Sequence, residues 1–338
     1  MRTPVFLAIC LAVAAAVYAA AVGVGNDYVF FAGYVILQYI VLSTAWNILG
    51  GYCGYVNFGS AAFFALGAYS TVATYKLIET QELPHVVPLP VLMLIGGVVS
   101  GIVGFGMGYL TLRLRGAFFA IATLALAVVL QTLIVNWDFV GGSRGAYVLR
   151  PEDLPLIGPY IRYLFLVMLL LAVAALVIAR LIERSRLGYG FATIRDDELA
   201  AEASGVPTLR LKLIATTISG ALMGMAGAPF PYYIGYLQPA STFGLDYAVN
   251  SIAMPLIGGT TSWVGPLIGT ILLGSLQQIV TVTISSAVNL LVVGVILVAF
   301  VILAPNGIIG LVHHYWQRKP EDFVGRRHVE TDAPGAVP

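Results

Sequence analysis

Long apolar runs alternate with short polar connections along almost the whole chain. Seven runs have the length, roughly 17–25 residues, with which an α-helix crosses a bilayer: Val5–Val24, Tyr28–Leu49, Phe58–Tyr75, Leu89–Leu110, Phe118–Val135, Ile161–Ile182 and Leu213–Tyr233. Three more follow, the first of them too short to cross unless it is tilted or broken: Tyr247–Ile257, Pro266–Ile284 and Ala287–Val312. The pattern predicts an all-α, polytopic membrane bundle of about ten transmembrane helices.

Two uncharged, glycine-rich interruptions separate apolar runs, Gly50–Gly59 (GGYCGYVNFG) and Gly258–Gly265 (GGTTSWVG). Irregular backbone near a membrane is tolerated where it lines a protein cavity, and broken helices form substrate sites in transporters. Ordinary tight turns are an equally good explanation. We therefore expect broken or re-entrant segments here and leave their role in a pathway open.

Glycines four residues apart recur within the predicted spans, at Gly97 and Gly101, Gly104 and Gly108, Gly220 and Gly224, and Gly265 and Gly269. Small residues at this spacing let helix backbones approach closely inside a membrane. These glycines predict helix packing rather than a binding site.

Composition agrees with a membrane protein. Hydrophobic residues make up 59% of the 338 residues and charged residues 10%, against about 25% charged in soluble domains. A net charge of +1 gives no electrostatic argument for binding nucleic acid, and two cysteines in or beside apolar runs, Cys10 and Cys53, predict no disulfide framework. The expected surroundings are a lipid bilayer.

The distribution of Lys and Arg predicts the orientation of the chain. With ten spans and both termini in the cytoplasm, four of the 17 basic residues fall outside, namely Lys76, Arg144, Arg150 and Arg162. The alternative that the first run is a cleaved signal, with Ala19–Ala21 as its small-residue site, disturbs this balance. We assign residues 1–316 to the transmembrane domain and expect the polar tail 317–338 to be disordered.

The longest polar connection, residues 183–212, contains five of the 16 acidic residues. Within it, Asp196–Ser204 (DDELAAEAS) has the acidic first turn and alanine content of a short helix, followed by the stop signals Gly205 and Pro207. A plain solvated connection is the competing interpretation. The segment predicts a folded docking element on the cytoplasmic side.

Several kinds of chemistry are missing from the sequence. No charged residue lies in the interior of a predicted span, which argues against a carboxylate ion relay. No GxxxxGK[ST] loop, no Cys/His cluster with metal-ligand spacing and no GxSxG elbow occurs. The chain is expected to need neither a cofactor nor a metal and not to be an enzyme, so energy for transport would come from a partner.

Six separated motifs resemble one family: VNFGSAAFFALGAY (56–69), LRLRGAFFAIATLALA (112–127), NWDFVGGSRG (136–145), SRLGYGFATIRDDELAAEASGV (185–206), MPLIGGTTSWVGPLIG (254–269) and APNGIIGL (304–311). Their order and spacing, over residues 46–312, resemble the LivM-like permease subunits of branched-chain amino acid ABC importers. The resemblance implies a bacterial inner-membrane protein working with a second, homologous permease subunit, two ABC ATPase subunits and a periplasmic solute-binding protein.

The resemblance also implies residue roles. Glu202, Ala203 and Gly205 correspond to the short element that docks into the ATPase, and Arg195 and Asp197 are included in this candidate coupling set. ATP binding on the partner would move the element and open the pathway alternately to each side.

Polar or aromatic residues in or beside the spans are the candidates for the substrate pathway: Asn57, Ser60, Phe63, Thr123, Gln131 and Asn250. For Thr123 and Gln131, an interhelical hydrogen bond is an alternative role. The chain departs from the family pattern at Ser60, Val128 and Asn250, so amides, carboxylates and aromatic acids remain open beside branched-chain amino acids. A stand-alone channel or facilitator is the main alternative function.

Overall fold

The computed structural model of the protein describes residues 3–80, 87–111, 114, 116–150, 158–283, 286–303 and 307–311. Within these residues, eight helical segments are long and apolar enough to cross a membrane: α1 (Thr3–Val24), α2 (Asp27–Gly50), α3 (Ser60–Glu79), α4 (Leu89–Thr111), α5 (Ala117–Val135), α6 (Tyr160–Glu183), α9 (Thr208–Gly227) with its continuation α10 (Phe230–Ile234), and α13 (Val264–Thr283). The all-α, polytopic fold is confirmed, and the predicted tail 317–338 lies outside the described residues.

The two remaining predicted runs correspond to α12 (Leu245–Gly258) and α14 (Ser286–Leu303). At 14 residues, α12 has the shortness that its run predicted. The other elements are short: α7 (Arg186–Asp196), α8 (Glu198–Ala203), α11 (Pro239–Thr242), the 3-10 turns η1 (Asp138–Val140) and η2 (Gly142–Arg144), and the strands β1 (Ala146–Tyr147) and β2 (Tyr236–Leu237). The strands form an antiparallel pair in which Ala146 lies opposite Leu237.

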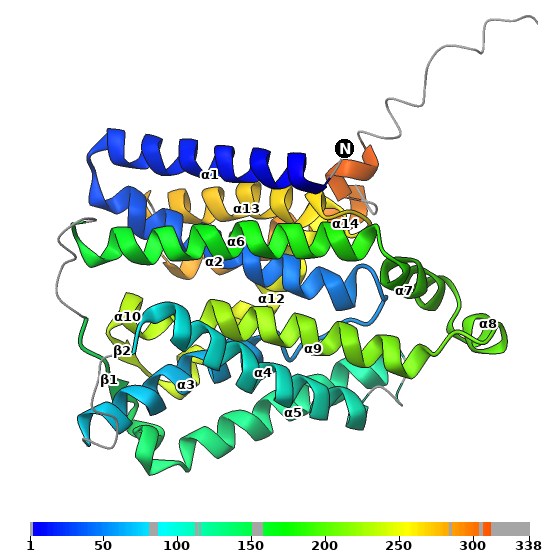
Figure 1. Cartoon of the computed structure of the whole chain (residues 1–338), viewed down its shortest axis with the longest axis horizontal. Coiled ribbons are helices and arrows are strands. Elements are labelled where there is room, and N and C mark those ends of the chain that lie inside the picture. The colour runs from blue at the N-terminus through cyan, green and yellow to red at the C-terminus, as the bar shows by residue number, and fades with distance from the viewer. Residues whose placement is uncertain are drawn as a thin grey trace, which may run out of the picture.

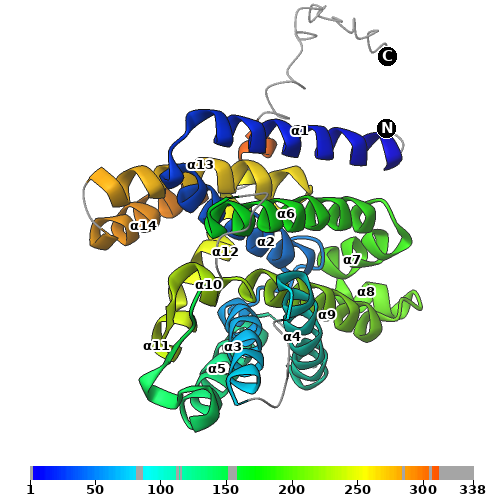
Figure 2. The same ribbon diagram turned by 60° about the vertical axis from the view of Figure 1, so that its left-hand side comes forward.

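The long helices run roughly along one direction, with α7 and α8 at one end of the bundle and the β1–β2 pair at the other (Figure 1). Helix α2 lies at the centre and contacts α6, α9, α12 and α13, while α9 packs against α3 and α4. Seen from the side, α1, α13 and α14 lie on one flank, and α3, α4 and α5 on the other (Figure 2).

Glycine determines how closely α3, α4 and α9 approach. A Cβ atom on Gly67 of α3 would overlap the Gly224 carbonyl of α9, and one on Gly224 would overlap the Gly96 carbonyl of α4. Lipid gives no hydrophobic drive for helices to associate, so close backbone packing of this kind contributes much of the attraction. The packing role predicted for the spaced glycines is confirmed between α4 and α9.

Helix α5 is attached along one narrow face. It buries Phe119, Thr123, Ala127 and Ile134, and large side chains such as Phe118 on its other faces are exposed. In a multi-pass membrane protein such an apolar outer surface is suited to contact with lipid or with another membrane chain.

Two boundaries differ from the sequence-based prediction. Helix α9 begins at Thr208, directly after Pro207, and not at Leu213, so Lys212 lies inside the helix. The prediction that no charged residue lies within a span is therefore wrong for Lys212. Residues Arg186–Asp196 also form a helix that was not predicted, because only two apolar side chains, Phe191 and Ile194, mark its buried face.

Candidate coupling and translocation site

The polar connection 183–212 folds into two capped helices at one end of the bundle (Figure 1). The Ser185 hydroxyl oxygen accepts a backbone amide of α7 at 3.1 Å. Asp197 both ends α7 and caps α8, and its carboxylate accepts two backbone amides of α8 at 2.9 and 3.1 Å. The helix predicted for Asp196–Ser204 exists as α8, but Asp196 belongs to α7.

Each of these helices exposes a large apolar side chain. Tyr189 of α7 is 71% exposed and Leu199 of α8 is 63% exposed. Helix α7 is anchored by the buried side chains of Phe191 and Ile194, whereas α8 buries only Ala201. The connection is folded, and its outer surface is partly apolar.

Two of the predicted coupling residues act within the chain. An Arg195 guanidinium nitrogen donates to the Gly51 carbonyl at 3.5 Å, and the aliphatic part of the side chain lies beside Gly54. Asp197 is occupied as a helix cap. Both residues therefore shape the connection and its attachment to the segment between α2 and α3.

The other three predicted coupling residues are exposed at the far end of α8. The Glu202 carboxylate accepts the Thr208 hydroxyl at 2.8 Å, which links the end of α8 to the start of α9. Ala203 is exposed, and Gly205 has φ of 83° with no atom near the position of a Cβ. These three residues are accessible to a partner.

The first glycine-rich interruption, between Gly50 and Ser60, is irregular, as predicted, and the structure shows that it is also largely buried. Trp46 Nε1 donates to the Asn57 carbonyl at 2.9 Å, and the Asn57 side-chain oxygen accepts the Gly59 amide at 2.7 Å. The Phe58 amide donates to the Thr123 hydroxyl of α5 at 3.1 Å. Hydrogen bonds to α2 and α5, together with one within the segment, therefore fix this segment, which we name break one (residues 51–59).

The structure brings Asn57, Ser60 and Thr123 together around break one. The Ser60 hydroxyl and the Asn57 side-chain nitrogen are buried and have no hydrogen-bond partner among the described residues. Phe63 is also buried, but its ring lies against Gly104 and Gly220, in the contact of α3 with α4 and α9. Phe63 therefore supports this region by packing.

Asn250 and Gln131 lie apart from this group. The Asn250 oxygen accepts the Gln277 amide of α13 at 2.8 Å, and its nitrogen donates to the Tyr39 hydroxyl of α2 at 3.4 Å. Gln131 is half-buried on α5, about two turns beyond Thr123. The predicted pathway residues therefore form one cluster and two separate positions.

The second interruption, break two (residues 259–263), lies between α12 and α13. Glu183, at the end of α6, connects it to break one: the same carboxylate oxygen accepts the Trp263 amide at 2.8 Å and the Tyr52 hydroxyl at 3.3 Å. Burial, with the neighbouring Glu183 charge, raises the pKa of Tyr52, so its hydroxyl stays protonated and remains a donor. Sequence reasoning missed Glu183, because its partners are distant in the chain.

A buried ion pair was also missed. Lys212 of α9 lies 2.6 Å from Glu198 of α8. Lys212 was assigned to the polar connection, where a charge is unremarkable. Lys212 is the last residue of the polar connection and directly precedes an apolar run. This position was the one signal that α9 begins before Lys212 and includes it.

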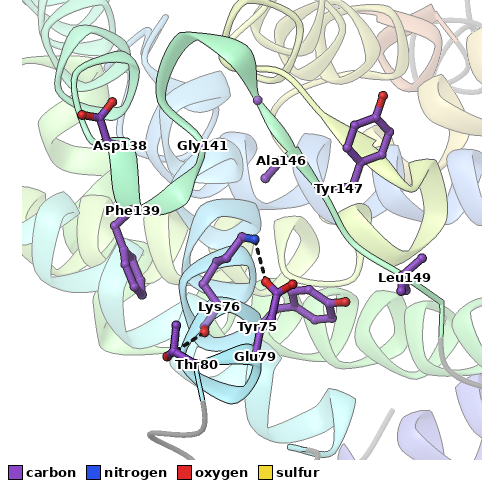
Figure 3. Close-up of a pocket in the computed structure, with 11 residues that line it drawn as sticks. Tyr75, Lys76, Glu79, Thr80, Asp138, Phe139, Gly141, Ala146, Tyr147 and Leu149 are labelled. Carbon is purple, nitrogen blue, oxygen red and sulfur yellow. Dashed lines mark hydrogen bonds and ion pairs between the residues drawn. The ribbon is translucent and has the colours of Figure 1, made fainter.

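A pocket of about 610 Å³ opens at the opposite end of the bundle, around the end of α3 (Figure 3). Its wall includes Tyr75, Asp138 and Tyr147, and the ion pair between Lys76 and Glu79 at 2.6 Å. The pocket combines charges of both signs with aromatic surface, and it faces away from α7 and α8.

Comparison with known protein families gives one decisive match. The family described as "Branched-chain amino acid transport system / permease component" matches residues 28–301, which is most of the chain. The chain belongs to this permease family. The resemblance inferred from its motifs is confirmed, and this permease is a membrane component of a transport system.

Individual relatives that match the chain are also permease proteins. The permease is 29% identical to the high-affinity branched-chain amino acid transport system permease protein LivM of Salmonella typhimurium and to that of Escherichia coli, over 80% of its own chain and 67% of each relative. It is 30% identical to the ribose import permease protein RbsC of Bacillus subtilis over 36% of its chain and 40% of that protein. No solved structure matches the permease.

Proposed function

We propose that this permease is one subunit of an ATP-driven importer and that a partner ATPase binds α7 and α8. The observation that carries the proposal is the folded α7–α8 unit, which lies at one end of the bundle (Figure 1) and exposes Tyr189 and Leu199. A connection that merely joins two spans needs neither the two caps nor exposed large apolar side chains. We propose that these two side chains are among those that the ATPase contacts.

The residues of this unit divide into two proposed roles. Glu202, Ala203 and Gly205 are exposed and would contact the ATPase. Arg195 and Asp197 would keep the unit in place, because one is bonded to break one and the other caps α8. Closure of two ATPase subunits would then move α8 relative to the bundle.

The proposed path for the solute passes break one. The unpartnered Asn57 nitrogen and Ser60 hydroxyl are a donor and a donor–acceptor that a passing polar solute would satisfy. Thr123 fixes the same segment, Phe63 supports it from behind, and Gln131 and Asn250 would contact the solute further along. This chemistry suits a small amino acid, or a related amide or carboxylate.

The proposed assembly lies in a bacterial inner membrane, with both termini of this chain in the cytoplasm. A second, homologous permease subunit would complete the pathway. The pocket beside Lys76 would then face outwards, where a periplasmic solute-binding protein releases its cargo (Figure 3).

Gentle detergent extraction of the permease from native membranes, followed by identification of co-purifying chains and an ATPase assay, tests this proposal. We expect two ATPase subunits and a second permease. In the purified complex, Ala203→Cys should cross-link to the ATPase, whereas Thr80→Cys, exposed at the opposite end of the bundle, should not. Recovery of the chain alone, passing leucine in liposomes without ATP, would establish a stand-alone facilitator.

A further inference from the structure

A buried ion pair attaches the start of α8 to the bundle. The Lys212 side chain is 3% exposed, and its Nζ lies 2.6 Å from Oε1 of Glu198, the first residue of α8, whose side chain is 12% exposed. Removing two charges from water costs as much as their attraction returns in many proteins, so a buried pair is a weak source of stability. The pair does, however, define the position of α8 relative to α9. If Glu198 moves away from Lys212, their hydrogen bond breaks and their attraction weakens while both charges stay desolvated.

Tyr55 of break one is the third member of this cluster. Its hydroxyl lies 3.2 Å from Lys212 Nζ and also donates to the Glu198 carboxylate. The Lys212 ammonium lies 4.7 Å from the centre of the Tyr55 ring, which suits a cation–π contact. The Tyr55 and Phe119 rings, the second from α5, make an edge-to-face contact with their centroids 5.0 Å apart. Four elements, α5, α8, α9 and break one, therefore meet at a single cluster.

Packing alone holds α8 weakly. It has six residues and buries only Ala201, so the contacts of Glu198 carry much of its attachment. A pocket of about 370 Å³ lies beside the cluster, between Tyr55 and the first turn of α5, with Glu198 in its wall. Close packing would prevent Tyr55 from following a displacement of α8, and this pocket leaves it room to do so.

We propose that Glu198, Lys212 and Tyr55 are the positioning residues through which movement of α8 reaches break one. The proposal rests on the proposed function, in which an ATPase moves α8. Tyr55 stands two residues before Asn57, and the Phe58 amide is bonded to Thr123. Displacing Glu198 therefore acts on the backbone that carries the proposed pathway residues.

Cys53 reports on break one without knowledge of the solute. It is fully buried in the segment between the two membrane-spanning helices, and burial raises the pKa of its thiol to about 12. Its reaction with N-ethylmaleimide should therefore be slow at rest, because the thiolate is the reactive form. Cys10→Ala removes the other cysteine and provides the background for labelling.

The experiment uses the complex purified from membranes, labelled with and without ATP and vanadate. In the Cys10→Ala background we expect nucleotide to change the Cys53 labelling rate by about fivefold or more, a usual size for coupling between sites. Glu198→Gln and Tyr55→Phe should reduce this response to less than about twofold. In Tyr55→Phe, which lies outside the proposed ATPase-binding helices, the ATPase subunits should stay bound and basal ATP hydrolysis should be unchanged.

Asp27→Asn is the matched control. It removes a carboxylate from a partly exposed ion pair with Arg162, at 3.3 Å, at the other end of the bundle, so its labelling response should equal that of the background. A full response in both Glu198→Gln and Tyr55→Phe, or an equal loss in Asp27→Asn, would overturn the proposal. So would a Cys53 rate that nucleotide leaves unchanged.

The two proposals fail separately. If no ATPase accompanies the unmodified chain, the proposed function is wrong. If the ATPase binds and hydrolyses ATP while the variants respond normally, only the positioning role is wrong. If Glu198→Gln does not yield an assembled complex, Tyr55→Phe, which removes a single hydroxyl, decides the question.

Discussion

The two breaks both interrupt apolar helices, but different contacts fix them. Break one is fixed largely by side chains: Trp46 and Thr123 bond its backbone, and Tyr55 reaches out of it to Glu198. Break two is enclosed by backbone. A Cβ atom on Gly265, at the start of α13, would overlap the carbonyl of Gly259 in break two, and one on Gly258, at the end of α12, would overlap the Gly265 carbonyl.

This difference separates a segment that can change its contacts from one that cannot. Side-chain hydrogen bonds can exchange partners while the backbone around them keeps its shape. Close backbone packing allows no such adjustment, because any displacement creates an overlap or a gap. We therefore expect break two to be a rigid support, and substitutions to affect the two breaks in different ways.

The largest effect is expected next to break two, where α12 and α13 pack backbone against backbone. Gly269→Leu places a side chain where α12 and α13 have adjoining backbones, and should destabilise the protein by about 3 kcal/mol or more. Thermal unfolding in detergent measures this. Gly106→Leu is the control, because nothing lies within 4 Å of a Cβ at this exposed position of α4. Equal stability of the two variants would contradict close backbone packing of α12 against α13.

A smaller effect is expected where the breaks are joined. Glu183→Ala removes the carboxylate that accepts the Trp263 amide and the Tyr52 hydroxyl. Because it leaves donors without a charged acceptor, we expect a loss of about 2–3 kcal/mol in unfolding free energy. Glu79→Ala removes an acid from the surface pair with Lys76, at 57% exposure, and should cost less than about 1 kcal/mol. If Glu183→Ala and Glu79→Ala lose similar amounts of unfolding free energy, Glu183 stabilises the protein no more than a surface charge does.

The smallest effect is expected at the attachment of break one to α5. Thr123→Val keeps the shape of the side chain but removes the hydroxyl that accepts the Phe58 amide, at an expected cost of about 1–2 kcal/mol. Thr123→Ser keeps the hydroxyl and should recover most of the difference. If serine is no better than valine in thermal unfolding, the hydrogen bond does not fix break one.

The sequence predicts most of the fold because hydrophobic length is a local property. All ten apolar runs became helices, and both breaks fall where glycine replaces apolar residues. The failures are also local. The apolar content of α7 is too low to signal a helix, and the start of α9 was set five residues late because Lys212 and Arg210 look like part of a polar connection.

The candidate site was harder to predict, because its contacts join residues far apart in the chain. Tyr55 and Glu198 are 143 positions apart, and Tyr52 and Glu183 are 131 apart. Local sequence patterns were enough to select Asn57, Thr123 and Glu202 as candidate functional residues. They carried no information about which helix would supply the partner of each, so Glu183, Glu198 and Lys212 went unnoticed.

Asp197 joins α7 to α8 without a connecting loop. It is at once the C-cap residue of α7 and the N-cap residue of α8, and its backbone is extended. Gly205, with positive φ and open space around it, lies just past the other end of α8. Both ends of the short helix are thus closed by hydrogen bonds, from its backbone amides to the Asp197 carboxylate at the start and from the Val206 amide to the Ala201 carbonyl at 3.0 Å at the end. With both ends closed, α8 would pass a push from the ATPase to Glu198 as one rigid piece.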